Sequence, residues 1–218
     1  QIEEICFLFA PVRGPSRSTA NLMTQPSWNF SRSAAGALSW LDYLRDPRRP
    51  RVASDGAAAV VLGTEPPPKG PSVQWTGSAR HSAPEHREHL RFDHRRGLLR
   101  NLLSAEVPSL SARHARTVFD RACQQHGRNP AGGTGWIWHA GGREVLRALR
   151  REFGLTEKQT EPSSSVLLHH GNMSSPSCLF ALQAALQNGV PDGLWWLASF
   201  GAGFSSFGAF LEDRKSVV

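Results

Sequence analysis

The chain has 218 residues, of which 39% are apolar, and it carries a formal net charge of +7. This length and composition suit one large or two small globular domains, and no apolar run approaches the roughly eighteen residues of a membrane-spanning helix. The positive charge is mostly arginine scattered over loops and helix faces, so we expect a basic rim for anionic substrates and neither a nucleic-acid nor a membrane partner.

The first quarter of the chain is predicted to hold two strands with an irregular segment between them. Residues 5–10 are mostly apolar and indicate a strand. Residues 53–63 combine small and apolar side chains, which predicts a second strand that packs closely in a sheet. Residues 13–52 are rich in serine, proline and arginine without a sustained period, so we expect a divergent, irregular insertion there.

The next stretch is rich in histidine and leaves two interpretations open. Residues 64–80 contain a run of prolines and are predicted to form turns. The histidines that follow, together with acidic side chains, are His81, His86, His89 and His94. Imidazoles at these spacings could share a helix face and bind a metal ion. Because no cysteine accompanies them and their neighbours are charged, we favour a solvated face without metal, continuing as a strand, a turn and a further element across residues 91–101.

A helix is predicted over residues 108–127, because Leu110 and Val118 share one side and arginines take the other. Cys123 extends the apolar side of this helix, so we expect it in the core. The remaining cysteines, Cys6 and Cys178, show no paired spacing with it or with each other. This cysteine usage predicts a reducing, cytoplasmic location without structural disulfides or zinc.

A short aromatic run over residues 136–138 is typical of a buried strand, and it ends at His139. Two glycines follow, and then an amphipathic helical pattern that closes at Gly154. His139 is therefore expected at a strand-to-helix turn.

A second turn of the same kind surrounds Asn172. Pro176 stands in the first turn of a predicted helix, where a missing N–H costs nothing, and the helix is expected to end at Gly189. Asn172 is therefore expected just before a helix N-terminus. Two core strands, residues 194–200 and 207–211, are predicted beyond it, with a glycine-rich loop between them.

His139 and Asn172 form a candidate donor pair. A histidine and an asparagine held at the mouths of two rigid elements can stabilise negative charge that develops on an oxygen atom. Both side chains offer neutral N–H donors, which can be aimed without adding a cation. We therefore expect these two residues to work together in a catalytic site.

Four motifs occur in a fixed order along the chain. They are the strand that starts at Asp55-Gly56, then His139-Ala140-Gly141-Gly142, Gly171-Asn172-Met173-Ser174-Ser175 and Phe200-Gly201-Ala202-Gly203. With these motifs the sequence resembles the type III polyketide synthases, the chalcone and stilbene synthase group of the thiolase-like superfamily. His139 and Asn172 are 33 positions apart, as the corresponding pair is in that family. The likeness covers residues 53–212.

The resemblance implies an α/β fold of the thiolase-like layered kind, in which helices cover a mixed sheet. Its C-terminal half is expected to be nearly complete in residues 64–218, whereas residues 1–63 are expected to be a remnant of a truncated N-terminal half. The missing half would normally pack against this one, so we also expect exposed apolar surface.

The resemblance also implies an acyltransferase that condenses malonyl-CoA onto an acyl-CoA starter, forms homodimers and uses no cofactor beyond these coenzyme A thioesters. In the family a cysteine thiolate takes the acyl group, while the counterparts of His139 and Asn172 hold the thioester carbonyl as malonyl-CoA loses carbon dioxide. None of the three cysteines fits the context of that nucleophile. We therefore expect a fragment or a degenerate copy that lacks it.

Substrate-binding residues are implied at two further places. Ala53 stands near the position where the family usually carries a bulky phenylalanine that shapes the substrate channel. The glycine-rich loop corresponds to one that borders the active-site cavity in the family, and its residues are Gly201, Ala202, Gly203 and Phe204.

Two alternative functions stay open. The nearer is a ketoacyl synthase III-like condensing enzyme, although that group typically follows its histidine with Gln-Ala-Asn and not with two glycines. The other is a non-catalytic pseudoenzyme or binding partner that holds a thioester or a full-length subunit.

Overall fold

A six-stranded mixed sheet forms the centre of the protein, in the order β2-β1-β3-β8-β7-β6. The computed structural model describes residues 4–6, 56–63, 72–95, 98–129, 134–188 and 193–213. The strands of this sheet are β1 (Glu4–Cys6), β2 (Val61–Gly63), β3 (Ser72–Ser82), β6 (Gly135–Trp138), β7 (Leu194–Gly201) and β8 (Ser205–Asp213). Neighbouring strands are antiparallel except β6 and β7, which run parallel.

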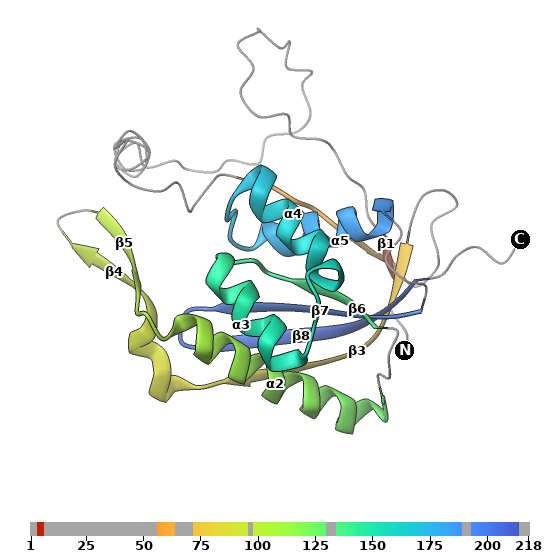
Figure 1. Ribbon diagram of the computed structural model, residues 1–218, viewed down its shortest axis with the longest axis horizontal. Coiled ribbons are helices and arrows are strands. Elements are labelled where there is room, and N and C mark those ends of the chain that lie inside the picture. Colours follow the sequence, from red (N-terminus) through yellow and green to blue (C-terminus); the bar gives the residue numbers. More distant parts are fainter. Residues whose placement is uncertain are drawn as a thin grey trace, which may run out of the picture.

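Helices cover both faces of the sheet, so the described residues form three layers (Figure 1). The helices are η1 (Pro84–His89), α2 (Val107–His126), α3 (Arg143–Phe153), η2 (Lys158–Thr160), α4 (Glu161–His170) and α5 (Pro176–Asn188). α2 and α3 pack together on one face, and α4 and α5 lie on the other. None of the described helices combines the length and the apolar content needed to cross a membrane.

A separate hairpin, β4 (Leu90–Arg95) and β5 (Leu98–Leu103), projects from one end of the molecule (Figure 1). Phe92 on this hairpin is 57% exposed, and Leu103 is 59% exposed. Of the elements predicted across residues 91–101, the strand and the further element are confirmed, and the further element is also a strand. The turn predicted between them includes residues 96 and 97, which lie outside the described residues.

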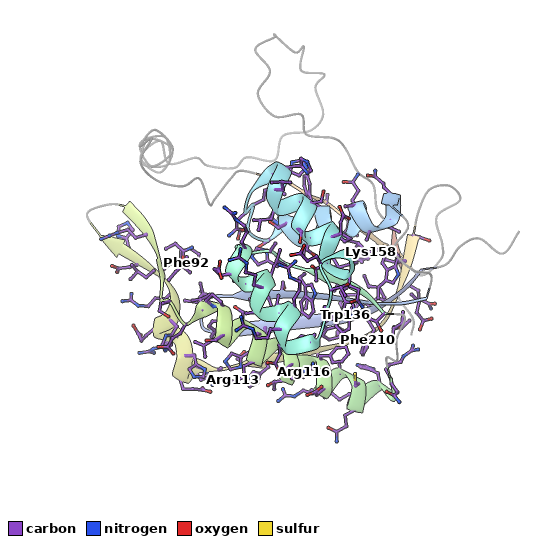
Figure 2. All side chains as sticks on the ribbon, viewed as in Figure 1. Phe92, Arg113, Arg116, Trp136, Lys158 and Phe210 are labelled. Carbon is purple, nitrogen blue, oxygen red and sulfur yellow. The ribbon has the colours of Figure 1, made fainter. Side chains whose placement is uncertain are left out.

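Aromatic side chains fill the space between the sheet and the pair of helices α2 and α3. Trp138, Trp196 and Phe210 come from three adjacent strands and are fully buried. The Phe119 ring of α2 lies 5.1 Å from the Trp196 ring and 5.3 Å from the Trp136 ring. Trp136 and Phe210 can be found at this junction in Figure 2. Full burial of one large apolar side chain contributes about 1.5–3 kcal/mol, so this cluster dominates the stability of the layer.

β6 is covered on both faces, and so is β7 at Trp195 and Trp196, which explains the apolar sequences of these segments. Trp196 and Ala198 of β7 point toward α2 and α3, whereas Trp195 points toward α5. β6 is buried along its whole length. A parallel pair covered on both faces is apolar at nearly every position and does not alternate.

Most of the elements predicted after residue 107 are confirmed. The helix over residues 108–127 is α2, and Gly127 ends it in the left-handed conformation. The aromatic strand before His139 is β6, the helix ending at Gly154 is α3, and the last two predicted strands are β7 and β8.

Predictions for the first part of the chain meet the structure less well. The predicted strand at residues 5–10 overlaps β1 at its first two residues, and residues 7–10 lie outside the described residues. In the predicted strand at residues 53–63, β2 occupies the end and residues 56–60 form no regular element, whereas residues 53–55 lie outside the described residues. The insertion predicted at residues 13–52 lies outside the described residues.

The prediction of turns over residues 64–80 is wrong for its second half. β3, the longest strand, starts at Ser72 and pairs with β8 along nearly its whole length. The alternation of apolar and polar residues typical of a strand is not visible in the sequence of β3. A bulge interrupts the register between Trp75 and Gly77, and Gln74 is a buried polar residue.

Helix α4 was not expected from the sequence, because one proline and three serines follow its first residue, Glu161. Pro162 occupies the first turn, where proline is tolerated. Ser163 is completely buried, and its Oγ accepts a hydrogen bond from the backbone N–H of Trp138 at 2.9 Å. The start of α4 is therefore held by β6, which is 25 positions away in the chain.

The free edge of β3 is covered by two side chains from α2. β1 pairs only with the first three residues of β3, and no other described strand pairs with that edge. Arg121 donates from Nη1 to the Arg80 carbonyl oxygen at 2.8 Å, and Nε2 of His126 lies 3.1 Å from both the backbone nitrogen and the carbonyl oxygen of Ser78. Gly77 makes room for the imidazole, because a Cβ there would lie 2.7 Å from the ring.

We expect Gly208→Ala to destabilise the protein. A Cβ at this position in β8 would lie 2.0 Å from the ring of Trp196, which is completely buried and packed against the rings of Phe119 and Phe210. The free energy of unfolding should fall by at least about 1–3 kcal/mol, the usual cost of overpacking a core. Chemical denaturation followed by tryptophan fluorescence measures this change. Gly201→Ala is the matched control, since no atom lies within 4 Å of its added Cβ. Equal losses in both variants would contradict the packing explanation.

Candidate functional site

His139 is carried at the end of the sheet where the parallel strands β6 and β7 finish. Its backbone N–H donates to the Ala198 carbonyl oxygen at 2.8 Å, which extends the pairing of β6 with β7 by one residue. The Gly141 N–H donates back to the His139 carbonyl oxygen at 3.1 Å and closes a tight turn before α3. The predicted strand-to-helix turn is therefore confirmed.

The imidazole of His139 is neutral at neutral pH. Burial lowers the pKa of His139 from 6.5 to about 4, because the charged form is poorly solvated in this site. Its Nδ1 atom is buried and has no hydrogen-bond partner among the described residues. A buried N–H without an acceptor is less tolerable than a buried lone pair without a donor. We therefore assign the ring proton to Nε2, which makes Nε2 a neutral hydrogen-bond donor.

Asn172 lies between α4 and α5, and backbone groups hold both ends of its amide. Its Oδ1 accepts a hydrogen bond from the Ser174 N–H at 2.9 Å, and its Nδ2 donates to the Gly141 carbonyl oxygen at 3.1 Å. Ser177 Oγ accepts a hydrogen bond from the Met173 N–H at 3.0 Å and ties the start of α5 to this turn. The orientation of the amide is thereby set, and one N–H of Nδ2 is left over for another acceptor.

The two candidate donors border the same glycine. Gly141 accepts the hydrogen bond of Asn172 through its carbonyl oxygen. A Cβ on Gly141 would lie 3.7 Å from Nε2 of His139. Residues 33 positions apart in the chain, on two different turns, are thus brought to one place.

The segment that leads into β2 passes beside this place. A Cβ on Gly56 would lie 2.5 Å from the sulfur of Met173, the residue after Asn172. Ala53 comes three positions earlier and lies outside the described residues, so its place in a substrate channel stays a prediction.

The glycine-rich loop 201–204 lies at the end of β7, and therefore at the same end of the sheet as His139. Ala202 and Gly203 are exposed and Gly201 is half-buried. Phe204 instead packs with Ala83 and Leu110 and is only 1% exposed. Contact of these four residues with a substrate stays a prediction, and for Phe204 it would require a change in side-chain position.

The histidines of residues 81–94 do not share a helix face, because they are divided among β3, η1 and β4. His114 of α2, which the sequence did not indicate, joins them, and its Nε2 lies 2.9 Å from Nδ1 of His86. Burial, followed by the neighbouring His81 and His86, lowers the pKa of His114. Among the described residues, no group of three or more histidine, cysteine, aspartate or glutamate side chains could hold a metal ion.

Cys123 and Cys178 lack the electrostatic surroundings of a nucleophile. Burial raises the pKa of both thiols, which disfavours the reactive thiolate. The Cys178 thiol donates a hydrogen bond to the Ser175 carbonyl oxygen at 3.1 Å. Cys123 packs against the core on α2, as the sequence predicted.

A groove of about 880 Å³ runs along the sheet and is not lined by His139 or Asn172. Its apolar lining includes Val60, Leu62, Trp75, Leu179, Leu182 and Leu197, and Arg80 and Arg121 are among its polar residues. Leu62 is 53% exposed, and Phe207, which also lines the groove, is 48% exposed. This part of the sheet surface is therefore only partly covered by the described residues.

Comparison with known proteins gives consistent results. A family model described as "Chalcone and stilbene synthases, C-terminal domain" matches residues 78–207. A curated 3,5-dihydroxyphenylacetyl-CoA synthase from Streptomyces toyocaensis is 33% identical over 144 residues, which make up 62% of this chain and 36% of that protein.

Solved structures show the same relationship. The C-terminal type III polyketide synthase domain of Steely1 from Dictyostelium superposes with a TM-score of 0.64 at 25% identity, over 74% of this chain and 46% of that one. The 1,3,6,8-tetrahydroxynaphthalene synthase of Streptomyces coelicolor A3(2) gives a TM-score of 0.65 at 24% identity, over 75% and 47%. The expected α/β fold, a mixed sheet covered by helices as in the thiolase-like synthases, is confirmed for this part. The chain spans about a third of the curated relative and less than half of each solved structure.

The lowered pKa of His139 predicts how stability depends on pH. The folded protein keeps this ring neutral down to about pH 4, whereas the unfolded chain binds the proton from about pH 6.5 downward. The unfolded state therefore binds more protons between these values, and the free energy of unfolding should fall as the pH is lowered through this window. The loss from His139 should be roughly 3 kcal/mol in total, and His114 adds to it in the same direction. Urea unfolding at several pH values from about 7.5 to about 4 measures how the free energy of unfolding changes with pH.

The variant His139→Gln isolates this contribution. It removes the titrating group, so its stability should depend less on pH than that of the natural protein. His169→Gln changes an exposed histidine of α4 and should keep the original pH dependence. A pH dependence in His139→Gln as steep as in the natural protein would contradict the buried, neutral state of His139.

Proposed function

This chain belongs to the chalcone and stilbene synthase family, whose C-terminal domain it contains, and from that premise we propose that it carries two of the three catalytic groups of a type III polyketide synthase. The two groups are His139 and Asn172. The observation that carries the proposal is that both side chains border Gly141. Nε2 of His139 would lie 3.7 Å from a Cβ on Gly141, and Nδ2 of Asn172 donates a hydrogen bond to the Gly141 carbonyl oxygen.

The proposed reaction step is the loss of carbon dioxide from malonyl-CoA. The bond between the carboxylate carbon and the α-carbon breaks, carbon dioxide leaves, and the electron pair remains as an enolate with its charge on the thioester oxygen. Nε2–H of His139 and the free N–H of Asn172 donate to that oxygen as its charge grows. The enolate carbon then attacks the thioester carbonyl of an acyl starter, whose carbon–sulfur bond breaks to release a thiolate, or it takes up a proton to give acetyl-CoA.

The electrostatics of the site support this role. A neutral imidazole stabilises the enolate oxygen as a hydrogen-bond donor, and the lowered pKa of His139 keeps it neutral at the pH of a cell. The amide of Asn172 is held at both ends, so little reorganisation is needed when the oxygen becomes charged.

The third group, a nucleophilic cysteine, is not identified in this chain. Cys123 and Cys178 have raised thiol pKa values, and neither is part of the turns that carry His139 and Asn172. We therefore propose a fragment or a degenerate copy of the synthase that does not form the acyl-enzyme by itself. Residues 64–218 would be the C-terminal domain, and residues 1–63 a remnant of the other half.

We propose that the apolar groove beside α5 is the surface on which the other half of the synthase fold packs. Its apolar lining and its partly exposed leucine and phenylalanine side chains fit a surface that needs a cover. Acyl-CoA and malonyl-CoA are the proposed ligands of the completed site, with no further cofactor, and the completed protein is proposed to form homodimers.

A non-catalytic role is the second candidate, because burial raises the pKa of the Cys123 and Cys178 thiols and neither is activated. A site with two donors and no activated thiol can still hold a thioester carbonyl without transferring the acyl group. Such a chain would bind coenzyme A thioesters and release them unchanged.

Incubation with isotopically labelled malonyl-CoA tests the catalytic proposal. The chain should convert malonyl-CoA to acetyl-CoA and carbon dioxide, measured by mass spectrometry. His139→Ala and Asn172→Ala should each slow this reaction on the order of a hundredfold, the usual effect of removing one donor from an oxyanion site. His169→Ala is the matched control and should keep the original rate. Decarboxylation that persists in the double variant His139→Ala/Asn172→Ala would remove the mechanism, whereas binding without decarboxylation would favour the non-catalytic role.

A further inference from the structure

Gly141 lacks the usual structural reasons for being a glycine. The glycines with a positive φ angle do not include it, so its backbone conformation suits any residue. An added Cβ would be no closer than 3.7 Å to a neighbouring atom, which is ordinary van der Waals contact. Neither backbone strain nor crowding therefore excludes alanine at this position.

What a side chain at Gly141 would change is the space next to His139. The two atoms within 4 Å of an added Cβ are Nε2 of His139, at 3.7 Å, and a methyl carbon of Val145, at 4.0 Å. Nε2 is the ring nitrogen that remains for a ligand, because Nδ1 is buried. A methyl group on residue 141 would therefore occupy the approach to Nε2 and leave the rest of the packing unchanged.

The carbonyl group of Gly141 acts on the second donor. It accepts one N–H of the Asn172 amide at 3.1 Å, and the Ser174 N–H holds the other end of that amide. Because Gly141 also donates its own N–H to the His139 carbonyl oxygen, the same residue is bonded to the turns of both donors.

We propose that Gly141 is the positioning residue of the site: its missing side chain keeps Nε2 of His139 open to a ligand, and its carbonyl oxygen holds Asn172 against the same opening. This inference rests on the proposed function only in the identity of the ligand, a thioester carbonyl. The adjacent Gly142 has no such role, because its φ is extended and no atom lies within 4 Å of a Cβ there.

Modification with diethyl pyrocarbonate tests the open approach without any substrate. The ring nitrogen without a proton attacks the reagent, so reaction at Nε2 of His139 goes through the minor tautomer that carries its proton on Nδ1. An ethoxycarbonyl group joins Nε2, ethyl carbonate leaves and the Nδ1 proton is released. Peptide mass mapping assigns each histidine separately. The full chain should react at His139, and Gly141→Ala should slow that reaction at least about fivefold, because packed surroundings leave little room for adjustment. Gly142→Ala should react like the natural protein. The exposed His169 serves as the internal standard in every sample.

The variant Asn172→Ala tests the bond to the carbonyl oxygen. Without the amide, the turn at residues 140–142 loses its link to the segment before α5, so His139 should react faster than in the natural protein, about twofold or more. Asn172→Asp should behave in the same way, since a carboxylate cannot donate to the Gly141 carbonyl oxygen.

The outcomes separate this inference from the proposed function. Equal His139 rates in Gly141→Ala and Gly142→Ala would overturn the open approach, and unfolding of Gly141→Ala would overturn it too, because the added methyl group should fit. An unchanged rate in Asn172→Ala would overturn the role of the carbonyl oxygen. None of these results depends on whether the chain decarboxylates malonyl-CoA, so a failure there would leave the geometry of Gly141 standing.

Discussion

The parallel pairing of β6 with β7 is the constraint on which the rest of the site depends. β6 is buried along its whole length, and Trp138 and Trp196 fit between the sheet and two helices with no exposed surface. The register of the two strands cannot slip without moving these rings out of the core. Because the backbone of His139 continues the same pairing through Ala198, the position of the imidazole is set by the packing of the sheet.

The second donor reaches the same point from the opposite face. Asn172 follows α4, and the first turn of α4 is hydrogen-bonded through Ser163 to the backbone of β6. The position of α4 is therefore set by the same strand that carries His139. One short strand thus locates both groups, directly for the histidine and through a helix for the asparagine. This arrangement explains how the turn that carries Asn172, although distant from Gly141 in the sequence, lies beside it with the Asn172 amide already oriented.

The sequence was sufficient to predict those elements whose burial pattern follows from residues close together in the chain. α2, α3, β6, β7 and β8 belong to this group, and the motif order was enough to single out His139 and Asn172. β3 and α4 could not be predicted, because Gln74 and Ser163 are polar residues buried by partners distant in the chain. The same holds for the unpaired Nδ1 of His139 and for the hydrogen bond between Asn172 and Gly141, since both arise only from tertiary packing.

The side chains laid along the outer edge of β3 have a consequence for association between molecules. An unpaired strand edge is a template on which a strand from another chain can add, which leads to aggregation. Here a guanidinium and an imidazole from α2 already occupy backbone groups of that edge, at Arg80 and Ser78. A strand added from another molecule would have to displace both side chains, so α2 protects this edge against polymerisation through the sheet.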